Sequence, residues 1–145
     1  MRNSRSRAGF TLVEVLIVSA VIGILAGIAT PRLARAIDKA AAGKVVADAR
    51  NITIAVRSYL TAGGTLPPTE DWGVTPAGLA PYLEENTSFA FRDAEYRFVS
   101  QPLIDMAQLW VRYPEGSGLG AALYNFRRPG EVTWTPTQTT FLLAQ

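Results

Sequence analysis

The stretch that decides the fold lies near the N-terminus, where residues 9–31 read GFTLVEVLIVSAVIGILAGIATP. Between Phe10 and Thr30 the only ionisable side chain is Glu14. At ~1.5 Å per residue these 21 residues form a helix of roughly 30 Å, the thickness of the hydrocarbon core of a bilayer. A carboxylate at mid-bilayer costs about 2.5–3.5 kcal/mol, so the sequence predicts that Glu14 has a partner.

Two general kinds of N-terminal segment compete for this stretch. A secretory signal peptide would use Arg2, Arg5 and Arg7 as its basic region and residues 27–29 as its cleavage site. The apolar run exceeds the ~7–15 residues usual for such peptides, however, and it contains Glu14. An ordinary single-span anchor explains the length but gives Glu14 no role.

A short basic leader that ends in Gly9, followed by Phe-Thr-Leu-x-Glu and an apolar helix, resembles the N-terminus of type IV pilins and type II secretion pseudopilins. The resemblance covers Gly9 to Pro31. It implies that a prepilin peptidase cleaves between Gly9 and Phe10 and methylates the new amine of Phe10. Pro31 falls where this family usually has a proline that takes part in filament assembly. The resemblance also implies that Glu14 pairs with the Phe10 amine of a neighbouring subunit, with its own amine as the alternative.

The resemblance implies a structural subunit that polymerises into a type IV pilus or a type II secretion pseudopilus. The expected partners are the prepilin peptidase, other subunits and the bacterial inner membrane. The chain would cross that membrane once, with its N-terminus cytoplasmic before cleavage and its head periplasmic or extracellular. The alternative is a minor pilin that recognises a surface or DNA at a filament tip. Trp72, Trp110 and Trp134 could serve such binding, although core packing is the simpler interpretation.

Charge and composition exclude several functions. From Arg32 onward eleven basic and eleven acidic side chains balance to zero, so the head has no electrostatic footprint for nucleic acid. The chain contains neither cysteine nor histidine, which removes disulfides, the usual transition-metal ligands and most nucleophile–base pairs. Glu131 is the only acidic residue after Glu115, so a C-terminal calcium loop lacks ligands. We therefore expect no catalytic residues, no cofactor and no metal site, and hence no enzyme.

The segment after Pro31 has the period of an amphipathic helix that continues to about Thr61 and ends at Gly63-Gly64. Its apolar positions predict the core-facing stripe Leu33, Ile37, Ala41, Val45, Ala49, Ile52, Val56 and Tyr59, with charged residues, Asp48 among them, mostly in between. In the preceding stretch Ser19, Gly23 and Gly27 recur every four residues. Such small residues allow close helix packing, or reflect the frequency of Gly in spanning helices.

The rest of the chain predicts a small head. Residues 65–91 are a connector, with a short helical turn that Thr75-Pro76 opens and Pro81 ends. Strands are expected at 95–100, 108–113, 131–135 and 139–143, and a flexible loop at 116–120. The predicted fold is α+β: a long N-terminal helix with an antiparallel sheet of three to four strands. The predicted division is a leader (1–9), a transmembrane helix (10–30), a spine helix (31–64) and the head (65–145).

Overall fold

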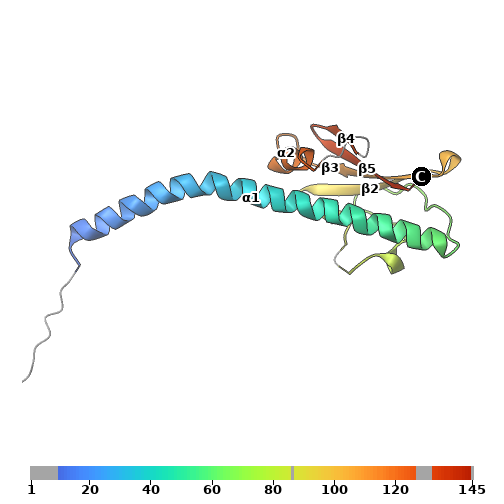
Figure 1. The fold of residues 1–145 in the computed structure, drawn as a ribbon, viewed down its shortest axis with the longest axis horizontal. Helices are drawn as coiled ribbons and strands as arrows, with labels where there is room; N and C mark the ends of the chain where they lie inside the picture. Colours follow the sequence, from blue (N-terminus) through green and yellow to red (C-terminus); the bar gives the residue numbers. More distant parts are fainter. Residues whose placement is uncertain (1–9, 86, 127–131, 145) are drawn as a thin grey trace, which may run out of the picture. The chain divides into compact units, whose positions relative to one another are not determined.

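The computed structural model describes residues 10–85, 87–126 and 132–144. It divides into two compact units, Met1–Ala36 and Ile37–Gln145. Helix α1 (Leu12–Thr61) begins in the first unit and continues into the second, which also holds every other helix and strand described (Figure 1). The predicted helical stretch before and after Pro31 is thus confirmed.

Within the second unit, one face of α1 is buried. The buried positions are spaced by helical period and are Ala41, Ala42, Val45, Asp48, Ala49, Ile52, Ala55 and Val56. The predicted stripe is therefore correct from Ala41 onward. It is wrong at Leu33 and Ile37, which are exposed because the core cluster of the head begins only at Ala41.

Helix α1 ends as its glycines predict. The amide of Gly64 donates to the carbonyl of Tyr59 and the amide of Gly63 to that of Leu60, both at 3.0 Å. This is the Schellman pattern, which requires a left-handed residue at the first position after the cap. Gly63 occupies that position with φ +88°.

The sheet is antiparallel throughout, with the strand order β1-β2-β3-β5-β4. Its strands are β1 (Ala90–Phe91), β2 (Ala94–Gln101), β3 (Met106–Arg112), β4 (Val132–Thr135) and β5 (Gln138–Ala144). The α+β fold class and the C-terminal hairpin are confirmed. The sheet exceeds the predicted three to four strands by β1, which is only two residues long.

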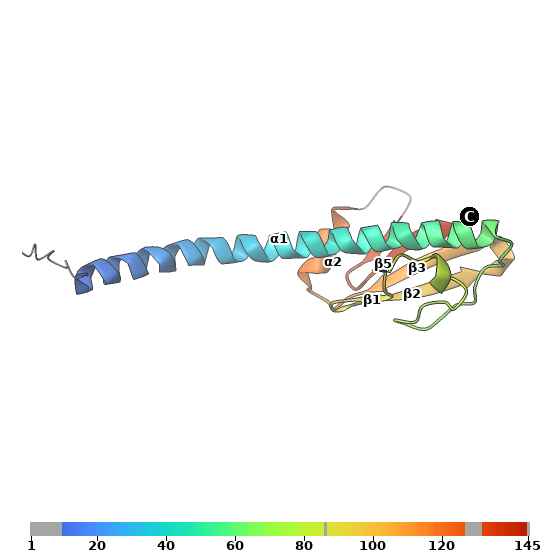
Figure 2. The same cartoon turned by 90° about the horizontal axis from the view of Figure 1, so that it is seen from below.

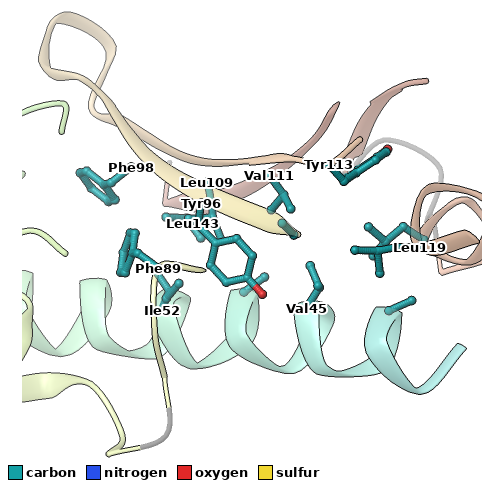
Figure 3. Close-up of a cluster of buried hydrophobic side chains, with 14 of the residues drawn as sticks. Val45, Ile52, Phe89, Tyr96, Phe98, Leu109, Val111, Tyr113, Leu119 and Leu143 are labelled. Atoms are coloured by element: carbon teal, nitrogen blue, oxygen red, sulfur yellow. The ribbon is translucent and has the colours of Figure 1, made fainter. Parts of the chain in front are cut away.

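The core of the head lies between α1 and one face of the sheet (Figure 3). Alternate residues point inward from the strands, as predicted: Tyr96 pairs with Val111, and Phe98 with Leu109. Across this layer Val45 and Ile52 come from α1.

The predicted flexible loop at 116–120 is wrong, because helix α2 (Gly118–Tyr124) begins there. The Ser117 hydroxyl caps the helix by accepting from the Gly120 amide at 3.3 Å. Leu119 and Leu123, one turn apart, are buried. A Cβ at Gly120 would lie 2.6 Å from the Tyr113 ring, so this glycine permits close packing rather than flexibility.

The connector also differs from its prediction. Its short helix, η1 (Ala80–Tyr82), is a 3₁₀ turn that includes Pro81 near its start instead of ending before it. Proline is accepted in a first helical turn because the missing amide has no partner there. Leu79 is buried in the core, and the Tyr82 ring meets Tyr59 of α1 edge-on at 5.8 Å.

Candidate assembly site on the N-terminal helix

The side chains of residues 10–36 are exposed throughout. This part of α1 contains a window with a mean hydropathy of 2.6, and the helix is long and apolar enough to cross a membrane. Its large exposed side chains are Phe10, Leu12, Val13, Val15, Leu16, Ile17, Val18, Val21, Ile22, Ile24, Leu25 and Ile28. An apolar surface of this extent needs lipid or other protein around it.

Glu14 caps its own helix. One carboxylate oxygen, Oε2, accepts from both the amide and the hydroxyl of Thr11 at 2.8 Å. In return the Glu14 amide donates to the Thr11 hydroxyl oxygen at 3.2 Å. This reciprocal pair is a capping box, with Thr11 at the N-cap and Glu14 three residues later. The Thr-x-x-Glu spacing signals this capping box in the sequence, so Thr11 is a partner of Glu14 in addition to the amines expected above.

The capping box leaves part of the carboxylate available. Among the residues that the structure describes, Oε1 of Glu14 accepts no hydrogen bond. Phe10, whose amine is the predicted partner, lies four residues before Glu14, and its side chain is 83% exposed. Gly9 lies outside the described residues. The carboxylate can therefore cap its own helix and still bind a cation of another chain.

Pro31 lies inside α1 and does not end it. One residue earlier, the Thr30 hydroxyl donates to the carbonyl of Ala26 at 2.8 Å, and Ser19 does the same to Val15. These bonds hide the hydroxyls from an apolar surrounding. A Cβ at Gly23 or Gly27 would meet nothing within 4 Å. Gly23 and Gly27 therefore pack against no other described part of the chain.

The described residues hold no group of three or more acidic side chains placed to bind a metal. The head contains two adjacent acidic pairs. Glu84-Glu85 is exposed, and Glu84 accepts from the Asn51 amide at 2.9 Å. In Glu70-Asp71, the Asp71 carboxylate accepts from the Trp72 amide at 2.9 Å.

One polar group in the head was missed by the sequence analysis. Asp48 was placed among the charged positions between the apolar ones, but it is fully buried. It forms an ion pair with Lys44, and the Tyr96 hydroxyl donates to it at 3.1 Å. The Lys44–Asp48 spacing of four residues is the one local signal for this group. The hydrogen bond between Tyr96 and Asp48 joins β2 to α1 through the core, and Figure 3 shows the Tyr96 hydroxyl directed toward α1.

Burial, together with the negative charge of Asp48, raises the pKa of Tyr96 well above its usual range. Above about pH 10 an unfolded chain loses its tyrosine proton, while folded Tyr96 keeps it. The folded state then binds more protons, so the free energy of unfolding should fall as the pH rises further. Unfolding of the detergent-solubilised protein, followed by near-UV circular dichroism between pH 8 and ~11, measures this decline in the free energy of unfolding. Tyr96→Phe should flatten the decline, and an equally steep decline would assign it to other groups.

Two of the three tryptophans, Trp72 and Trp110, do not pack in the core, contrary to the simpler interpretation above. Trp72 and Trp110 are half-buried and stand outside the core cluster. The Trp72 ring lies 4.5 Å from the Arg112 guanidinium and 6.0 Å from that of Arg97. Both arginines belong to the sheet face opposite the core, where connector residues 70–73 bond to the edge of β2. The side chain of Trp134 lies outside the described part of the chain.

Comparison with known proteins agrees with the N-terminal motif. A family model described as the prokaryotic N-terminal methylation motif matches residues 4–30. Fimbrial protein EcpB of Eikenella corrodens is 43% identical over 65 residues, which are 43% of this chain and 41% of that protein. Type II secretion system core protein G of Klebsiella michiganensis is 38% identical over 66 residues, or 46% of each chain. Neither relative is named as an enzyme.

The chain spans less than half the length of these curated relatives. No solved structure matches it. The N-terminal part of this chain carries the prokaryotic N-terminal methylation motif, and the chain is similar to a fimbrial protein and to a type II secretion core protein, as the resemblance at Gly9 to Pro31 implies.

Proposed function

We propose that the chain is a structural subunit that polymerises through residues 10–30 into a type IV pilus or a type II secretion pseudopilus. The observation that carries this proposal is the exposed apolar N-terminal half of α1. Near its start lies Glu14, of which only one carboxylate oxygen, Oε2, accepts hydrogen bonds from the described residues of its own chain. In the proposed division, residues 1–9 are the leader, 31–64 the spine and 65–145 the head. Before assembly the helix crosses the bacterial inner membrane, with the N-terminus cytoplasmic and the head periplasmic.

In the filament, Oε1 of Glu14 binds the Phe10 amine of the neighbouring subunit. At ~4 Å and an effective dielectric constant near 20, the attraction is about 4 kcal/mol. This matches the ~2.5–3.5 kcal/mol that a charged side chain costs inside the membrane. Assembly therefore offsets the insertion cost of Glu14. Pro31, Gly23 and Gly27 supply a segment in which helical hydrogen bonds are easily lost during assembly.

The leader is cut by a prepilin peptidase between Gly9 and Phe10, and the new amine is methylated. The intact mass of the protein from its native membrane should therefore correspond to residues 10–145 plus one methyl group. A Gly9→Glu variant should keep its leader, because the residue before the cut is changed. A mature N-terminus at Thr30 would instead identify a secretory signal peptide.

The second candidate function is a minor pilin that binds a surface or DNA with its head. The observation that favours it is the Trp72 ring held against Arg97 and Arg112, since stacked aromatic and cationic groups bind nucleic acids.

We expect the head to bind DNA poorly, because the charges from Arg32 onward balance and non-specific affinity comes from neutralised phosphates. Fluorescence anisotropy with the detergent-solubilised protein, at low and physiological salt, tests this on duplex and single-stranded DNA. Sub-micromolar binding that Trp72→Ala abolishes would favour the minor-pilin alternative.

A further inference from the structure

The hairpin between β2 and β3 presents an apolar tip to solvent. The tip is the 3₁₀ turn η2 (Pro102–Ile104) followed by Asp105. Leu103 is 100% exposed and Ile104 57% exposed, so neither is used by the core of its own chain. Pro102 restricts the turn at one end, and left-handed Asp105 (φ +49°) closes it at the other. The tip is thus a fixed apolar knob that carries one acid.

The C-terminal end of α1 carries a hollow, in contrast to the protruding tip of the hairpin. A shallow hollow of about 500 Å³ is lined by Ile54, Arg57, Ser58, Thr61 and Ala62. Ile54 is 62% exposed although it lies in the second compact unit, and Arg57 is exposed one turn further on. Within the described residues, neither Arg57 nor Asp105 takes part in an ion pair. Figure 2 shows that the hairpin between β2 and β3 lies at the same end of the second unit as the C-terminal end of α1.

We propose that the hollow of one copy receives the knob of a second copy, with Leu103 and Ile104 on Ile54 and with Asp105 against Arg57. The occupant is a second copy because the two surfaces complement each other in polarity and charge: each exposes an aliphatic side chain, and Asp105 and Arg57 have opposite charges. The contact joins two different surfaces, so an assembly of several copies still has an unoccupied knob at one end and an unoccupied hollow at the other. Such heterologous contacts build open assemblies when the rotation that relates one subunit to the next does not close into a ring.

The inference rests on the proposed function only in that the second copy is a neighbour in the same filament.

Because the chain has no cysteine, a disulfide between two introduced cysteines can report the contact directly. The full-length protein is expressed in its native membrane with Ile54→Cys and Leu103→Cys together, oxidised, and separated on a non-reducing gel. We expect a ladder of dimers, trimers and larger species. Either substitution alone joins at most two chains.

The matched control is Leu103→Cys combined with Ala40→Cys, since Ala40 is exposed on the same helix ~21 Å from Ile54. This pair should give no ladder. In the reporting pair, Arg57→Asp should lower the cross-linked fraction about fivefold, the upper range for an exposed ion pair. Adding Asp105→Arg to this variant should restore the cross-linked fraction, because positions 57 and 105 then carry opposite charges again.

Equal ladders from the reporting and control pairs, or no species beyond the dimer, would overturn the contact. Electron microscopy of the same cells keeps the two proposals apart. Filaments without a ladder contradict the knob-and-hollow contact alone. A ladder without filaments supports the contact and contradicts polymerisation, while the absence of both contradicts both.

Discussion

Glu14→Val is expected to abolish filaments while the cleaved protein accumulates in the inner membrane. The substitution removes the proposed attraction to the Phe10 amine of the next subunit, about 4 kcal/mol at each contact. It also makes the helix more apolar, so membrane insertion should be undiminished. Fractionation measures the membrane-bound protein, electron microscopy the filaments, and intact mass the cleavage and methylation.

The capping box supplies a control that separates two roles of Glu14. Glutamine at this position can still accept from Thr11, so Glu14→Gln keeps the helix cap but removes the charge. Thr11→Val keeps the charge but removes the hydroxyl of the cap. If the charge pairs between subunits, Glu14→Gln should assemble as poorly as Glu14→Val, while Thr11→Val should still assemble. Normal filaments from Glu14→Gln would reduce the role of this residue to capping.

Local periodicity was sufficient to predict α1 and the strands. The stripe from Ala41 to Val56 follows from apolar residues three and four positions apart, and the facing of β2 and β3 follows from alternation. Both patterns repeat over several residues, so one misleading position does not change the prediction. The extra strand β1 is two residues long and offers no such repeat.

Helix α2 was not predicted because its glycines are required by contacts with side chains outside the helix. Gly120 accommodates the ring of Tyr113, and a Cβ at Gly118 would collide with Asp38 of α1. From the sequence alone, closely spaced glycines indicate freedom of the backbone. The cap at Ser117 and the pair Leu119 and Leu123 were the local signals that favoured a helix.

Of the candidate site, the motif and the exposed apolar helix could be predicted, because both are continuous in sequence. The capping partner of Glu14 was also readable, from its spacing to Thr11. Asp48 could not be placed in the same way. Its buried partner Tyr96 lies 48 residues further on, and the bond exists only once β2 has packed on α1.

This burial gives the second large expected effect. Lys44→Met should lower the stability of the head by about 2–3 kcal/mol, because it leaves the fully buried carboxylate of Asp48 without its cation. The figure lies below the 3–5 kcal/mol typical of fully buried pairs, since 36% of the Lys44 side chain is exposed. The melting temperature should fall by about 10 °C or more. Near-UV circular dichroism of the detergent-solubilised protein follows the melting of the head.

Lys39→Met is the matched control, because Lys39 is exposed on the same helix and its loss should change stability by at most about 0.5 kcal/mol. The triple variant Lys44→Met, Asp48→Leu and Tyr96→Phe removes all three polar groups together. Replacing a buried charge and its partners with apolar groups of similar volume is often neutral, so this variant should recover most of the lost stability. A Lys44→Met variant as stable as Lys39→Met would show that the Tyr96 hydroxyl alone satisfies Asp48, and that the ion pair contributes nothing to joining α1 and β2.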